Sequence, residues 1–209
     1  MDLHEGTSHL LRGDGGILHM KLPGEENFKP VLEIHGPVRF RPDALQNVNV
    51  FCMFALRESA SDTFVDPRTC DFGDTFALLI DFDKFMKRVN AAMPSTGQEL
   101  QSDLVDYIDE TSYLGPVGIF KKASRFSYQS EFRIALLPGT GAPFRLHVGN
   151  LSDIVIVGRL SQLNERLQVK VNAEGRRTLL ISADSEGCRS AFRTDVDHDS
   201  EVMPISVPN

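Results

Sequence analysis

The sequence predicts an α+β fold: a single domain with a mixed or antiparallel sheet of six to eight strands and two or three helices. Most apolar residues lie in short runs of strand length, and several runs alternate with polar residues. One segment, 82–93, shows a sustained helical period. Of the 209 residues, 41% are hydrophobic and 24% are charged, which is ordinary for a soluble chain that buries a core.

Two apolar runs define the expected sheet. Segment 48–56 is almost free of polar residues after Asn49, so we expect a central strand that is buried on both faces and contains a buried Cys52. Segment 128–137 alternates, which predicts a strand with one core face and one polar face. The other predicted strands are 17–22, 31–35, 38–40, 75–80, 104–108, 144–148, 154–157 and 178–182.

The helical period predicts a helix that begins after Asp81 or Asp83, because either carboxylate can accept hydrogen bonds from the first backbone amides. Segment 160–167 is a candidate for a second helix, with Ser161 as its cap. Segments 57–74 and 94–103 are polar and are expected to be mobile loops beside a cleft. The apolar residues on the core face of the first helix are Phe82, Phe85, Met86, Val89 and Met93.

The predicted domain spans residues 1–193. Residues 194–209 are acidic, contain proline and have no period, so we expect a loose tail.

Charge and cysteine content limit the functional classes. With 22 Lys plus Arg against 29 Asp plus Glu, the net charge of −7 argues against binding driven by nucleic-acid phosphates. No apolar run is long enough to span a membrane, and the amino terminus lacks a basic leader, so we expect a cytoplasmic protein. The three widely spaced cysteines and the unpaired histidines predict reduced thiols and no metal site.

The best site candidate is segment 120–133, FKKASRFSYQSEFR. If 128–137 is one strand, Gln129, Glu131 and Arg133 share its polar face. The alternative interpretation is a solvent-facing strand on which Glu131 and Arg133 form a weak exposed ion pair.

These residues resemble the carboxy-terminal part of an uncharacterised bacterial domain-of-unknown-function family. The family pattern is a lysine, an aromatic residue, E-x-E, an aromatic residue and an arginine. The resemblance is carried by Phe120, Lys121, Phe126, the segment 128–133 and the apolar strand at 154–157. It extends back through residues 50–80 and covers about half of the chain. Gln129 stands where the pattern has its first glutamate.

Gln129-Ser130-Glu131 is also similar to the Q-x-E motif of ADP-ribosyltransferases. This resemblance implies that NAD is the substrate and that Glu131 stabilises the ribosyl cation formed when nicotinamide leaves. Gln129 would orient the ribose or the acceptor. Arg133 would either hold a phosphate of NAD or only neutralise Glu131. The implied substrate-binding candidates are Arg133, Lys121, Arg39, Arg57 and Ser59.

The leading functional prediction is ADP-ribosyl transfer from NAD, or NAD glycohydrolysis, in a bacterial or phage toxin or defence system. The acceptor, a protein or a nucleic acid, stays open, as does the oligomeric state. The alternative is a non-catalytic interaction domain on the same scaffold. A third interpretation is an enzyme that acts on a nucleotide other than NAD.

Overall fold

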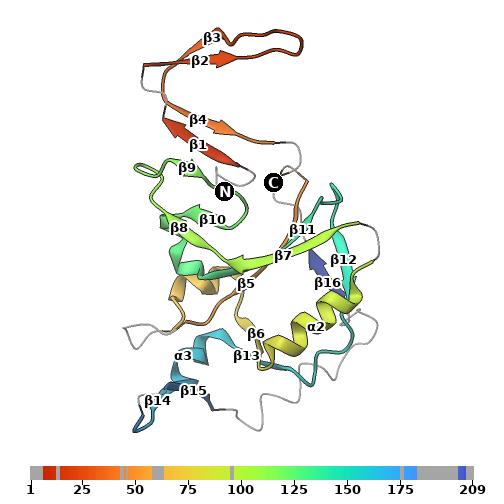
Figure 1. Cartoon of the computed structure of the whole chain (residues 1–209). Helices are drawn as coiled ribbons and strands as arrows, with labels where there is room; N and C mark the ends of the chain where they lie inside the picture. Colours follow the sequence, from red (N-terminus) through yellow and green to blue (C-terminus); the bar gives the residue numbers. More distant parts are fainter. Residues whose placement is uncertain are drawn as a thin grey trace.

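The computed structural model describes residues 7–12, 15–42, 45, 47–57, 64–94, 97–174, 177–182 and 202–205. It confirms the α+β class (Figure 1). The described strands are divided among seven small sheets of two or three strands, rather than gathered in one sheet of six to eight. Most pairs are antiparallel and one is parallel, so the strands are mixed in direction.

The central sheet contains β5 (Asn49–Phe54), β11 (Glu131–Leu137) and β7 (Glu99–Leu104), in the order β5-β11-β7. Strand β11 is antiparallel to both neighbours, and its residues 134–136 are fully buried. Three predictions are therefore corrected. Strand β5 is an edge of this sheet, Cys52 is exposed, and much of the expected loop 94–103 is strand β7, because β11 offers it a partner.

Helix α2 (Phe82–Ala92) covers one face of this sheet and confirms the predicted helix. Its cap is Asp81, whose carboxylate accepts a hydrogen bond of 2.9 Å from the backbone N–H of Lys84. Phe85 and Val89 are buried in the main core cluster together with Ile134 of β11. The apolar period of the helix thus forms the core contact that its spacing predicted.

Beside and below the central sheet in Figure 1, the molecule is built from small paired elements. Strand β6 (Thr75–Leu79) pairs with β13 (Val155–Arg159), β12 (Phe144–His147) with β16 (Val202–Ile205), and β14 (Leu167–Val171) with β15 (Arg177–Ile181). The short helices are η1 (Pro67–Phe72), η3 (Leu160–Gln162) and α3 (Leu163–Arg166).

These elements confirm the predicted strands at 75–80, 144–148, 154–157 and 178–182 in position. Ser161 is not a helix cap, because it lies inside η3 and no side chain caps η3 or α3. Most of the predicted loose tail, 194–209, lies outside the described residues, and its described part forms β16.

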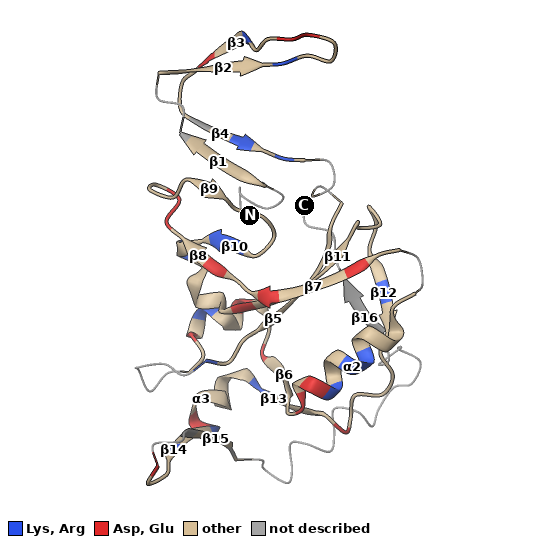
Figure 2. Cartoon of the chain, viewed as in Figure 1, with Lys and Arg blue, Asp and Glu red and all other residues tan. Residues whose placement is uncertain are grey.

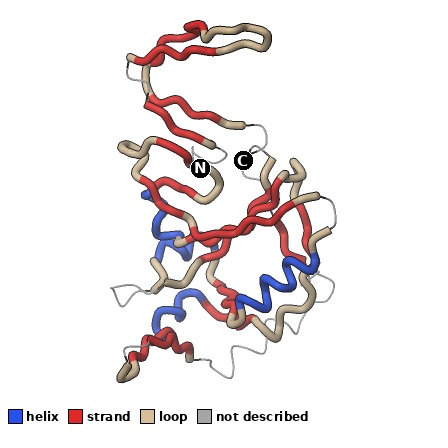
Figure 3. Tube along the Cα trace, viewed as in Figure 1, coloured by secondary structure: helices blue, strands red, loops and turns tan. Residues whose placement is uncertain are grey.

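The upper part contains the sheet β4-β1-β9, made of β1 (His9–Arg12), β4 (Pro37–Phe40) and β9 (Gly115–Pro116). Above it stands a hairpin of β2 (Gly16–Met20) and β3 (Lys29–Ile34), which we call the arm and define as residues 16–34 (Figures 1 and 3). Among the described residues, these two strands pair only with each other. The prediction of strands at 17–22, 31–35 and 38–40 is confirmed in position.

Candidate functional site

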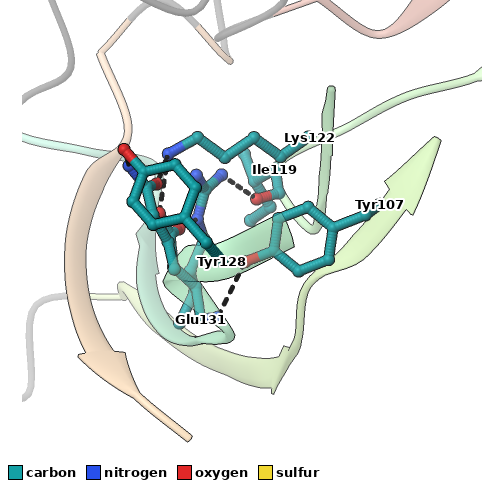
Figure 4. A network of polar contacts seen from close by, with 7 residues as sticks. Tyr107, Ile119, Lys122, Tyr128 and Glu131 are labelled. Carbon is teal, nitrogen blue, oxygen red and sulfur yellow. Dashed lines mark hydrogen bonds and ion pairs between the residues drawn. The ribbon is translucent and has the colours of Figure 1, made fainter. Parts of the chain in front are cut away.

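Segment 120–133 forms a buried network of charged side chains (Figure 4). The Lys122 ammonium donates hydrogen bonds of 2.6 Å to Oε1 of Gln129 and 2.6 Å to Oε1 of Glu131. Arg133 donates from Nε to Oε2 of Glu131 at 2.8 Å, and from Nη1 to the backbone carbonyl of Ile119 at 2.6 Å. Both oxygens of the Glu131 carboxylate therefore bind a cation.

A tight turn brings these side chains together. Lys122 lies on β10 (Lys121–Ala123), which pairs in parallel with β8 (Asp106–Ile108), and the chain then forms η2 (Ser124–Gln129) before β11 begins. Ser130 joins η2 to β11 with φ of 41°, a left-handed conformation that is uncommon for serine. Ala55 holds it there: its N–H donates to the Ser130 carbonyl at 2.6 Å, and its carbonyl accepts from the Ser130 hydroxyl at 2.7 Å.

The network is almost completely removed from water. Lys122 is 8% exposed, Glu131 is 7% and Arg133 is 4%. Burial by itself raises the pKa of Glu131, but the charge of Arg133 and the hydrogen bond and charge of Lys122 outweigh it, so the pKa is lowered. Glu131 is therefore an ionised carboxylate near neutral pH. Two cations face one anion, and the carbonyl oxygens of Gln129 and Ile119 each accept one further donor.

Two tyrosines enclose the network. The backbone N–H of Glu131 donates to the Tyr107 hydroxyl at 2.8 Å, and burial raises the pKa of Tyr107. The amide of Gln129 donates to the Tyr128 hydroxyl at 3.2 Å. On its other side, the Tyr128 ring lies 4.1 Å from the guanidinium carbon of Arg68, a cation–π distance. The Tyr128 contact orients the Gln129 amide, and the Tyr107 contact satisfies the backbone N–H of Glu131.

The predicted residues are only partly brought together. Gln129, Glu131 and Arg133 do converge, but not on one polar strand face, because residues 128 and 129 belong to η2. The predicted strand 128–137 begins only at Glu131. The exposed ion pair of the alternative interpretation is also wrong, since both partners are buried. The alternation of apolar and polar residues correctly indicated two faces of β11. The polar face is nevertheless buried, because η2 and β10 cover it.

The remaining candidates lie elsewhere. Lys121 points away from the network, with its ammonium 3.9 Å from the Asp106 carboxylate. Arg57 is exposed, and its positive charge partly opposes the burial that raises the pKa of Tyr107. Arg39 is exposed on β4, in a different sheet. Ser59 lies outside the described residues.

Sequence reasoning missed Lys122, which holds the network together. In β10 the neighbouring lysines point to opposite sides, so Lys122 is buried while Lys121 is part-exposed. A strand of three residues gives too short an alternation to distinguish the two lysines.

Three cavities lined by described residues have no lining residue from the Lys122, Gln129, Glu131 and Arg133 network. An apolar cavity of about 610 Å³ lies between β5, β6 and the start of α2, and its lining includes Phe82, Leu104 and Phe132. Neither Gln129 nor Glu131 lines it.

A second unusual surface is the arm. Phe28 is 67% exposed and Leu32 is 61% exposed, far above the usual exposure of such residues. Two glutamates lie in the turn at its tip, at positions 25 and 26. The short alternation of residues 17–22 was visible in the sequence, but that alternation predicted a covered face. The large apolar side chains that the arm exposes are Ile17, Met20, Leu22, Phe28, Val31 and Leu32.

Neither a metal centre nor a membrane-spanning helix is found among the described residues. They contain no group of three or more His, Cys, Asp or Glu side chains arranged to hold a metal ion. No helix among them has the length and apolar character needed to cross a bilayer.

Comparisons of the chain with protein-family models, with curated proteins and with solved structures found no match. The resemblance to an uncharacterised family and to ADP-ribosyltransferases therefore stays a prediction that rests on residues 120–133 and 154–157.

Proposed function

We propose that this chain is an interaction domain that binds a protein partner through the arm. The observation that carries the proposal is the set of six large apolar side chains exposed on one hairpin. They lie on both faces of the hairpin, because Ile17 pairs with Glu33 while its neighbour Leu18 pairs with Leu32. A chain that keeps such a surface on a projecting element gains free energy when a partner covers it.

The charges of the arm favour a protein over a membrane or a nucleic acid. The arm carries charges of both signs (Figure 2), and Lys29 pairs with Glu25 at 2.6 Å. It therefore presents no basic cluster of the kind that binds anionic headgroups or phosphates. Apolar side chains beside charges of both signs are typical of protein interfaces, with an apolar centre and a polar rim.

In this proposal the buried network has a structural role. Lys122, Glu131 and Arg133 tie β10 and η2 to the central strand β11. Removing one partner of such a network leaves a buried charge without compensation, so the network favours one arrangement of this turn.

The proposal is tested with a photo-crosslinking amino acid placed at position 28. Phe72 provides the control position, because it is 71% exposed and lies outside the arm. In an extract of the cells that produce the protein, position 28 should give a discrete protein adduct and position 72 should not. Excess wild-type protein should compete for the adduct, whereas the Leu32→Ser protein should not. Equal crosslinking at both positions, or no adduct at position 28, would reject the proposal.

A second candidate function is ADP-ribosyl transfer or NAD glycohydrolysis. The observation that favours it is that Gln129 Oε1 and Glu131 Oε1 both lie 2.6 Å from the Lys122 ammonium. The pair thus already stabilises a positive charge at one point, as a ribosyl cation would require. For NAD to take this position, the Lys122 side chain has to move out.

Calorimetry with NAD, together with release of nicotinamide, tests this second candidate. The expected result is saturable NAD binding by the wild-type protein and by Glu131→Gln, with turnover reduced about 100-fold in the variant. If the wild-type protein neither binds nor consumes millimolar NAD in the presence of protein and nucleic-acid acceptors, the enzymatic proposal is rejected.

A further inference from the structure

We propose that the cavity between β5 and β6 binds a neutral aliphatic molecule with one polar end, of the chemical class of a medium-chain alcohol, and that the hydroxyl of Thr69 binds the oxygen at that end. The site lies on elements outside the arm, so this inference does not depend on the proposed function.

Two adjoining cavities form the site. The larger, of about 610 Å³, lies between β5, β6 and the start of α2, and the smaller, of about 210 Å³, reaches η1 and α3. The larger volume falls within the range of ~300–1,000 Å³ that is usual for small-molecule sites. Phe132 lines only the larger cavity and Leu163 only the smaller, so the combined space is elongated. The residues that line both cavities are Phe54, Leu56, Ala77 and Leu78.

The lining determines the chemical class of the ligand. None of the described residues that line the two cavities carries a charge, and most of them are leucine, phenylalanine, valine or alanine. An ionised group placed there would lose its hydration without gaining a partner, whereas each methylene of an aliphatic chain gains free energy when it leaves water. Phe72 and Phe82, which line the smaller and the larger cavity, are 71% and 43% exposed. A bound chain would cover part of this apolar surface.

Thr69 provides the contact for the polar end. It lines the smaller cavity, and its Oγ1 atom is buried without a hydrogen-bond partner among the described residues. Buried hydroxyl groups in folded proteins nearly always have a partner, and an unpaired one lowers stability. Because Oγ1 is closed off in this structure, the side chain has to turn about its Cα–Cβ bond to another staggered rotamer to meet the ligand. The ligand oxygen then pairs with Thr69, and the aliphatic chain extends toward Phe132.

The test is isothermal titration calorimetry of the full chain with hexanol, heptanol and octanol. Each added methylene that enters the cavity should lower the dissociation constant about fourfold, which is the fold-change that corresponds to ~0.8 kcal/mol per buried methylene. Octanoate has the same chain length as octanol but carries a charge. It should bind about tenfold more weakly than octanol, or worse, because the described lining offers that charge no partner.

Four variants locate the bound alcohol. Ala77→Phe places a ring where both cavities meet and should weaken octanol binding about tenfold or more. Ala91→Phe is its matched control, since Ala91 is exposed on α2 and lines neither cavity. Thr69→Val keeps the shape of the side chain and removes its hydroxyl, so it should weaken octanol binding about fivefold, as expected for one hydrogen bond. Leu32→Ser, in the arm, should bind octanol like the wild-type protein.

Methyl NMR of the wild-type protein keeps the test independent of whether the variants fold, which circular dichroism checks. Octanol should shift the methyl signals of Leu78 and Leu163 and leave those of Leu32 unchanged. The inference is overturned by an absence of saturable octanol binding, by equal dissociation constants for the three alcohols, or by octanoate binding as tightly as octanol. Undiminished binding by Ala77→Phe or Thr69→Val, or shifts at Leu32 instead of Leu78, would also overturn it. The adduct at position 28 does not involve the cavities, so the proposed function fails or holds separately.

Discussion

Replacing Glu131 by glutamine tests the role of the buried network directly. The substitution keeps the size of the side chain and removes its charge, so Lys122 and Arg133 remain as two buried cations without their shared anion. Removing one partner of a buried ion pair usually costs about 3–5 kcal/mol of unfolding free energy. The glutamine amide also presents a donor to one of the two cations. We expect a loss of about 3 kcal/mol, at the lower end because both the Glu131 and Lys122 side chains keep 10% exposure.

Lys122→Met is the matched comparison. It removes one of the two cations and leaves Glu131 paired with Arg133, so the charges that remain balance. Its main cost is the loss of two hydrogen bonds, one to Gln129 Oε1 and one to Glu131 Oε1, together about 2 kcal/mol. The order of the two effects, with Glu131→Gln the larger, follows from the charge count of the network and not from the size of the side chains.

Urea unfolding followed by far-ultraviolet circular dichroism measures both effects, because the chain has no tryptophan to report by fluorescence. With a urea dependence of about 2 kcal/mol per molar, a loss of 3 kcal/mol lowers the midpoint by about 1.5 M. An exposed residue would change the unfolding free energy by less than ~0.5 kcal/mol. A change of that small size for Glu131→Gln, or a larger loss for Lys122→Met, would refute the structural role of the network.

Three further predictions concern stability. Ion pairing lowers the pKa of Glu131 in the folded protein. The stabilisation by the ionised carboxylate is therefore complete above the unfolded pKa of ~4.3 and is lost as the pH falls through the folded pKa. The difference in unfolding free energy between wild type and Glu131→Gln should shrink in acid, as urea unfolding at several pH values would show. Asn164→Ala should cost about 2 kcal/mol, because Asn164 accepts from the Val65 N–H at 2.9 Å and donates to the Val65 carbonyl at 2.9 Å, as urea unfolding would show. Gly139→Ala should prevent folding, as judged by circular dichroism, because its Cβ would lie 1.4 Å from the Asn47 carbonyl oxygen.

Each of these predictions has a contradicting result. A stability difference for Glu131→Gln that is the same at every pH would show that the charge is not responsible. Gln168, exposed on β14, is the control for Asn164, and equal losses for the two alanine variants would contradict the second prediction. Gly97→Ala meets open space, but its φ of 76° disfavours a side chain, so it should cost only about 1 kcal/mol. A Gly139→Ala protein that is as stable as Gly97→Ala would contradict the third.

The sequence predicted the elements whose signals are local. Asp81 and the period of Phe85 and Val89 marked helix α2, because a cap and an apolar face are both read within one segment. The alternation in β11 was also correctly detected from Glu131 onward. In contrast, the start of that strand was predicted too early, because no feature of the sequence indicates that Ser130 adopts a left-handed backbone conformation.

Partnership between distant segments could not be predicted. Residues 48–56 have the more apolar composition, but β11 is the central strand because both β5 and β7 pair with it. The burial of Glu131 likewise depends on Lys122 and on the cover formed by η2, and the exposure of the arm depends on the absence of a facing element among the described residues. Periodicity separates two faces of a strand but does not say what lies on either.

The order of strands in the central sheet also has a consequence for synthesis of the protein. Both outer strands, β5 and β7, are made before β11, and the first pairing joins residues that are 77 positions apart, from Phe54 to Glu131. At about 5–20 residues per second, β5 waits several seconds on the ribosome with its apolar residues exposed and without its partner strand. Residues 49–54 are therefore the segment of the nascent chain that we expect to depend most on chaperones and to aggregate first when elongation stalls before β11.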